Sequence, residues 1–193
     1  MNMLTELGLL IRLSRSHQIA RRYFVVNGFD GALTMLGLNL GFYISGSVTT
    51  STAVSACIAT AIALGISGLS SGYVSEMAEK KRELRELEQA MVSDLEHSVH
   101  ATAARLVPVL IAFVNGLGPF LIAMLVTTPL WLEQAGFTMP FGAISSAIAT
   151  AFLVIFMMGM LLGWISGTFW LWSALRTLAI AVGTSLLILL FTP

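Results

Sequence analysis

Long apolar runs separated by short polar stretches dominate the chain. Several of these runs approach the roughly 20 mostly apolar residues that a helix needs to cross a bilayer. The pattern predicts five transmembrane helices, expected at residues 24–45, 51–73, 106–128, 141–164 and 173–191. The expected connections are a polar turn at 46–50, a loop at 129–140 and an aromatic turn around 163–172.

A charged stretch follows the second apolar run, and it holds most of the charged residues of the chain. It contains neither proline nor glycine, and apolar residues recur in it at helical spacing. These residues are Met77, Leu84, Leu87, Met91 and Leu95. We therefore expect a solvated amphipathic helical extension over residues 76–104, between the second and third spans.

Residues 1–22 combine an apolar pattern with basic residues. Arg12 and Arg15 interrupt the apolar part, which argues against a cleavable signal peptide. The segment fits either an amphipathic helix on the membrane surface or a disordered basic start that sets the topology.

Composition agrees with a membrane protein. The 193 residues are 56% hydrophobic and only 10% charged, whereas soluble domains carry about 25% charged residues. We expect one integral membrane domain over residues 1–193, without a basic surface for nucleic acid because the net charge is zero. Cys57 is the only cysteine, so no disulfide forms within one chain. No nucleotide loop, nucleophile elbow or HExxH motif is found, and no enzyme class is indicated.

The distribution of Lys and Arg predicts the orientation. These residues precede the first span, lie within 80–105 and recur at Arg176, while the other connections have none. By the positive-inside rule, the N-terminus and the 76–104 extension are cytoplasmic, and five spans place the C-terminus on the opposite side.

Asp30 lies inside the first predicted span. A charged side chain at the centre of a membrane helix costs about 2.5–3.5 kcal/mol, so it marks a functional site by default. Asn27 and Thr34, three and four residues away, share its helix face. The three residues form a cation or proton site, or else Asp30 lies near the membrane end or pairs with an arginine.

Small residues and prolines mark two further features. Gly37 with Gly41, and Gly68 with Gly72, are spaced four apart, which predicts close helix contacts at a homodimer seam. In the third span, a helix break is expected around Pro108, Asn115 and Pro119, and it either lines a site or is only a structural kink.

Three groups of side chains are candidate metal ligands. Glu76, Glu79, Glu83 and Glu86 follow one another along one helix stripe, which is either a metal-collecting or a solubilising face. His97 and His100 are three residues apart, and they form either a metal pair or a solvated helix end. Met157 belongs to a methionine cluster, which serves packing or binds a soft metal.

Four short segments resemble the vacuolar iron transporter family. Asn27-Gly28-Phe29-Asp30-Gly31-Ala32-Leu33-Thr34 is similar to the family's N-D-G-L-x-T motif. Ser71-Gly72-Tyr73-Val74-Ser75 followed by Lys81-Arg82-Glu83-Leu84 is similar to G-E-Y-V-S and Q-R-E-L. The family's broken third helix is similar to Gly116-Leu117-Gly118-Pro119-Phe120. The start of the family's helix five is similar to Trp172-Ser173-Ala174-Leu175-Arg176.

The resemblance implies a homodimer that exports Fe(II) or Mn(II) from the cytoplasm in exchange for protons, without an organic cofactor. This chain would be a short, divergent member. The family's glutamate of G-E-Y-V-S corresponds to Gly72 here, and Glu76 lies one turn further on. We therefore expect a proton-coupled transporter in which Asp30 exchanges proton for metal, aided by Asn27 and Thr34. The alternative is a non-transporting membrane protein that docks a partner through its cytoplasmic helix.

Overall fold

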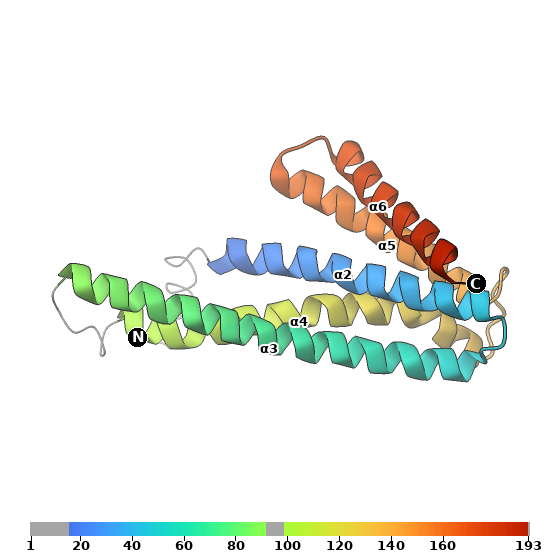
Figure 1. Ribbon diagram of the computed structural model, residues 1–193, viewed down its shortest axis with the longest axis horizontal. Coiled ribbons are helices and arrows are strands. Elements are labelled where there is room, and N and C mark those ends of the chain that lie inside the picture. Colours follow the sequence, from blue (N-terminus) through green and yellow to red (C-terminus); the bar gives the residue numbers. More distant parts are fainter. Residues whose placement is uncertain (1–15, 92–98, 193) are drawn as a thin grey trace.

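The computed structural model describes residues 16–91 and 99–192. Five helices account for most of them: α2 (Ser16–Ser45), α3 (Thr50–Met91), α4 (Val99–Gln134), α5 (Ala143–Ser166) and α6 (Trp170–Phe191). Successive helices run in opposite directions along one elongated bundle (Figure 1). The described part of the chain is therefore all-helical, as predicted.

Four of the described helices are long and apolar enough to cross a membrane, namely α3, α4 from Ala101, α5 and α6. They identify a multi-pass membrane protein. Helix α2 is not in this group, and three polar side chains within it, Asn27, Asp30 and Asn39, dilute its apolar composition. The membrane crossing of α2 stays a prediction.

Helix α4 packs against α2, α3 and α5 and forms the centre of the bundle. The chain is not broken at Pro108, Asn115 and Pro119, because α4 remains helical through this region, and the alternative of a structural kink there stays a prediction. Each proline removes its own N–H donor and crowds the carbonyl oxygen four residues back, and surrounding protein can compensate that loss in a bundle. Pro129 is also inside α4, so the connection expected at 129–140 begins only after Gln134. The first glycine after that helix, Gly136, has a φ of 95°.

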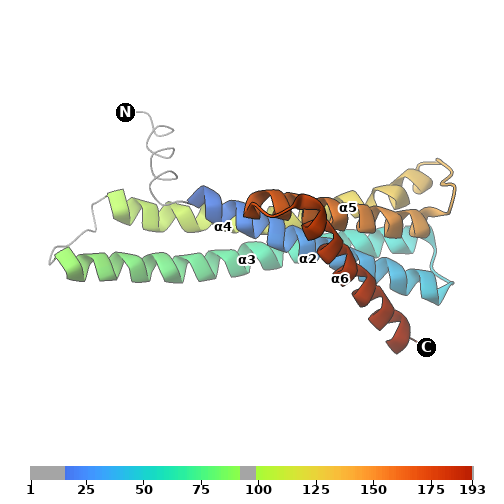
Figure 2. The ribbon, with the colours of Figure 1, turned by 90° about the horizontal axis from the view of Figure 1, so that it is seen from above.

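The charged stretch is not a separate helix. Helix α3 continues without interruption from the apolar segment to Met91, and α4 returns beside it from Val99. Figures 1 and 2 both show the end of α3 and the start of α4 side by side, extending beyond the other helices. The predicted extension is thus the tip of an antiparallel α3–α4 hairpin.

Glycines allow α4 to approach both α3 and α2 at backbone distance. A Cβ added to Gly68 would meet the Asn115 carbonyl oxygen at 2.8 Å, and one added to Gly116 would meet the Gly65 carbonyl oxygen at 2.5 Å. On the other side, a Cβ on Gly31 would meet the Pro119 carbonyl oxygen at 2.8 Å. The predicted seam at Gly68 and Gly72 therefore lies within one chain, between α3 and α4.

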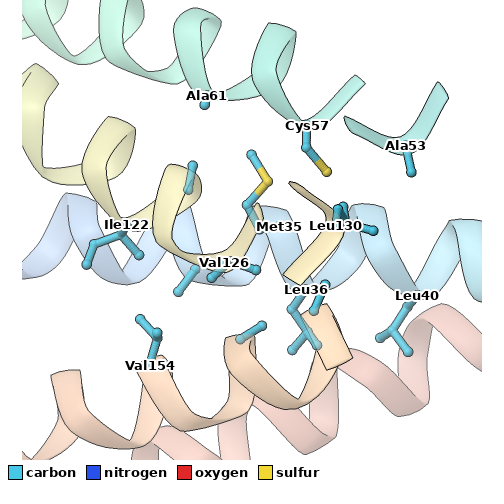
Figure 3. Packing of buried hydrophobic residues seen from close by; sticks show 14 of the residues in the cluster. Met35, Leu36, Leu40, Ala53, Cys57, Ala61, Ile122, Val126, Leu130 and Val154 are labelled. Atoms are coloured by element: carbon cyan, nitrogen blue, oxygen red, sulfur yellow. The ribbon is translucent and has the colours of Figure 1, made fainter. Parts of the chain in front are cut away.

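A continuous apolar core joins α2, α3, α4 and α5 in the half of the bundle away from the hairpin tip. Figure 3 shows Met35 and Leu36 of α2 packed among residues of the other helices. Met35, Leu36 and Leu130 are fully buried there. Helix α6 packs mainly on α5, and its C-terminal part leans away from the bundle (Figure 2).

Candidate functional site

Asp30 lies on the outward face of α2 and is exposed. Thr34, one turn further on, is exposed beside it and donates a hydrogen bond from Oγ1 to the backbone oxygen of Asp30 over 2.8 Å. Neither of the two ion pairs found among the described residues includes Asp30. The structure therefore brings Asp30 and Thr34 together, and it presents the carboxylate to whatever covers this face.

An open groove continues from Thr34 along α2 towards the end of that helix. Its volume is about 440 Å³. A Cβ added to Gly41 would have no atom within 4 Å, and one on Gly37 would only touch Ile188 at 3.5 Å. The groove is lined by Leu33, Thr34, Gly37, Leu38, Gly41, Phe42 and Thr60. Nearly all of this lining is apolar, so the groove suits a protein surface or lipid.

Asn27 faces α4 and takes part in a different cluster. Its Nδ2 donates to the Tyr23 backbone oxygen over 3.0 Å and to the Asn115 side-chain oxygen. Asn115 in turn donates to the Gly68 carbonyl oxygen on α3 over 2.6 Å. The amides thus join three helices, and Asn27 is engaged inside the bundle while Asp30 faces outward.

Gly72 explains how Asn115 fits between α3 and α4. A Cβ added to Gly72 would lie 2.8 Å from Asn115 Nδ2 and 3.1 Å from Ala112 Cα. A glutamate at this position would therefore compete with Asn115 for the same space. Asn115 of α4 thus occupies the space that an acidic side chain at position 72 would need.

Glu76 differs from the rest of the acidic stripe, because it is buried with 7% of its surface exposed. The Tyr23 side chain makes a hydrogen bond with the Glu76 carboxylate, and Arg22 lies against the same side chain, with its guanidinium carbon 5.8 Å from the ring centre. Burial, followed by the charge of Glu76 and this hydrogen bond, raises the pKa of Tyr23 above its ordinary value. Glu76 thus belongs with Tyr23 at the junction of α2 and α3.

The other acids of the stripe are exposed on the protruding part of α3. Glu83 pairs with Lys80 over 2.5 Å, and Glu86 pairs with Arg82 over 2.8 Å. The Glu86 hydrogen bond and charge, with a smaller contribution from Glu79, raise the pKa of Arg82. Nowhere among the side chains of residues 20–91 and 101–192 do three His, Cys, Asp or Glu groups converge as metal ligands would. The carboxylates of the stripe are therefore spaced along the helix and do not share one metal site.

The structure adds little about the weaker metal candidates, Met157, His97 and His100. Met157 is 57% exposed on the outside of α5. His97 lies outside the described residues, and His100 falls in the first turn of α4. Residues 1–15 of the predicted N-terminal segment also lie outside the described part.

A second polar cluster lies deep in the other half of the bundle, and sequence reasoning missed it. Asn39, Cys57 and Thr127 are fully buried, with Asn39 Nδ2 4.0 Å from the Cys57 sulfur. Asn39 Nδ2 also donates to the Met35 carbonyl oxygen, while its Oδ1 has no partner among the described residues. The isolated polar residue in the run Leu38-Asn39-Leu40 was the available signal.

The positive charges gather at one end of the bundle. The described lysines and arginines lie on the start of α2, the second half of α3, the start of α4 and the start of α6. These segments all point to the same end (Figure 1). The opposite end has Glu133, which accepts a hydrogen bond from Thr50 over 3.1 Å. The positive-inside rule predicts the orientation of a membrane protein from this kind of charge asymmetry.

Protein-family models, curated proteins and solved structures were all compared with the chain, and none of them matches it.

Proposed function

We propose that the protein is a proton-coupled transporter that exports divalent metal ions, Fe(II) or Mn(II), from the cytoplasm. The observation that carries the proposal is the exposed carboxylate of Asp30 on α2, one turn before Thr34, which lines an open groove. A carboxylate facing lipid at membrane depth is costly. The proposal therefore needs a molecule that covers this face of α2 and leaves room for a cation beside Asp30.

A second copy of the chain is the cover that fits this proposal. Gly37 and Gly41 leave the floor of the groove open, and small residues let helices approach closely in a membrane. Two copies packed along α2 would bring two Asp30 carboxylates to one seam. Carboxylate and hydroxyl oxygens suit Mn(II) and Fe(II), so a metal could pass between the copies.

In this mechanism Asp30 alternates between proton and metal. A carboxyl group at low dielectric favours its neutral form, and an arriving cation favours the ionised form. Metal binding therefore expels the proton, and metal release allows a proton to return. Glu79, Glu83 and Glu86 collect cations at the cytoplasmic mouth. The proposal includes α2 as a fifth span and a cytoplasmic N-terminus.

The alternative is a membrane protein that docks a partner through its cytoplasmic helix. Its apolar stripe is less available than the sequence indicates, since Met77, Leu84 and Leu87 are partly buried. Helix α4 runs beside this part of α3, and its Ala101 and Ala104 are buried. Part of the stripe is thus used within the hairpin, which favours transport over docking.

The test is metal flux into liposomes that carry a pH gradient. Asp30→Asn keeps the size of an exposed side chain but cannot ionise, so folding should be intact and pH-driven flux of Mn(II) should be lost. Asp30→Glu should retain part of the flux. Glu133→Gln at the opposite end is the control and should transport normally. Flux through Asp30→Asn equal to that of the unmutated protein would make Asp30 structural and reject the proposal.

A further inference from the structure

Arg176 is the only charged residue of the α5–α6 hairpin. The sequence from 135 to 193 contains no acid, no lysine and no second arginine. Arg176 is exposed, and neither ion pair among the side chains of residues 20–91 and 101–192 includes it. Its guanidinium stays charged in proteins and offers five N–H donors. Any anion that pairs with Arg176 therefore comes from outside this hairpin.

Exposed aromatic side chains flank the connection between α5 and α6. Trp164 is 76% exposed near the end of α5, and Phe169, Trp170 and Trp172 are exposed at the start of α6. Three of the four tryptophans of the chain lie here. The connection is at the end of the bundle to which the segments with lysine and arginine point (Figure 1). Tryptophan is enriched where a membrane protein meets the lipid headgroups, so this connection has the composition of a headgroup-level segment.

The Arg176 side chain reaches back to this aromatic connection. Its guanidinium carbon lies 5.6 Å from the centre of the Trp172 ring. Trp172 is one turn nearer the start of α6, and helical side chains tilt in that direction. The long stem of an arginine lies along apolar surface while the charged group stays near water. A cation and an exposed indole thus meet at the level of the headgroups.

We infer that Arg176 and the aromatic connection bind an anionic phospholipid, with its phosphate on the guanidinium and its acyl chains along the tryptophans. Charge complementarity selects this class of lipid. Guanidinium matches phosphate in two parallel hydrogen bonds, and a zwitterionic headgroup adds an ammonium group that opposes the arginine.

A second copy of the chain fits this surface less well. In a twofold contact the same surface is present on both copies. The α5–α6 hairpin of the second copy would bring another Arg176 and no acid to the contact. The inference does not depend on metal transport.

The test is quenching of tryptophan fluorescence by brominated lipids, with the full chain reconstituted in phosphatidylcholine vesicles. Trp131→Phe serves as the background, because it removes the one tryptophan of the chain outside this connection. At low fractions of brominated lipid, we expect phosphatidylglycerol to quench several-fold more strongly than phosphatidylcholine. Arg176→Gln should make the two lipids equal, and Arg176→Lys should keep part of the preference because it keeps the charge. Arg85→Gln, an exposed arginine on the protruding part of α3, is the control and should keep all of it.

Four results would overturn the inference. Equal quenching by the two lipids in the unmutated arginine background is the first, and it decides even where a variant does not fold. An unchanged preference in Arg176→Gln is the second. Loss of the preference in inorganic phosphate, at an ionic strength matched with NaCl, would assign the cation to free phosphate. Weak quenching by both lipids would mean that protein covers the indoles, and would assign the surface to a second copy. Asp30→Asn should keep the lipid preference, so loss of flux and loss of lipid binding are scored separately.

Discussion

Asn115 occupies the space that a side chain on Gly72 would need, since a Cβ at Gly72 would lie 2.8 Å from Asn115 Nδ2. The amide uses its position to bond the Gly68 carbonyl on α3 and to receive the Asn27 amide from α2. Three helices are therefore joined by one side chain at the place where α3 has no side chain at all.

This contact predicts a coupling between the two positions. Gly72→Ala should destabilise the protein by about 1–3 kcal/mol, because overpacking a tight contact forces atoms to shift. Gly183→Ala is the control, since a Cβ there has no atom within 4 Å, and it should be neutral or stabilising. In Asn115→Ala only part of the cost of Gly72→Ala should disappear, because the contacts at 3.1 Å with Ala112 Cα and with the Cβ of residue 115 remain. Equal stability of the two glycine variants in thermal unfolding would contradict the contact.

The groove on α2 predicts where two copies meet. Gly41→Leu should convert a dimer to a monomer in mild detergent, because the leucine fills space that lies open in one chain. Gly183→Leu, also in open space but on α6, should leave the dimer intact. Light scattering gives the mass of each variant. Dissociation by Gly183→Leu alone would move the seam to α6, and a monomeric unmutated protein would remove it altogether.

Helix α2 falls short of the apolar composition of the other four predicted spans. Whether it crosses the membrane can be tested separately. In a Cys57→Ala background, Arg21→Cys and Ser47→Cys place exposed thiols at the two ends of the apolar part of α2. An impermeant thiol reagent should label them from opposite sides of the membrane. Gln134→Cys should be labelled from the same side as Ser47→Cys. Labelling of Arg21→Cys and Ser47→Cys from one side would mean that α2 does not cross.

The exposed acids of α3 should act on metal capture and not on turnover. Replacing Glu79, Glu83 and Glu86 by Gln should raise KM for Mn(II) several-fold with little change in kcat, because the row concentrates cations before transport. The difference should shrink at high salt, which screens exposed charges. Glu133→Gln should leave KM unchanged. An unaffected KM in the triple variant would make the row a solubilising face.

Spacing along one helix was enough to place Asp30 beside Thr34, and apolar length was enough to place four of the helices. Spacing could not separate Glu76 from Glu79, because both belong to the same stripe and only Glu76 is buried, beside Tyr23 of α2. Asn27 was misplaced for a similar reason, since its partner Asn115 is distant in sequence.

The uneven charge of the two bundle ends restricts how copies can assemble. All segments with described lysines and arginines point to one end, and the positive-inside rule predicts that every copy inserts with the same polarity. Two copies that share the α2 groove must then stand parallel, with their twofold axis along the membrane normal. Residues on that axis face their own counterparts at equal depth. In the proposed dimer, each substitution at Asp30 would be made twice at one level of the membrane. A tandem fusion of one unmutated and one Asp30→Asn copy would then reveal whether a single carboxylate supports flux.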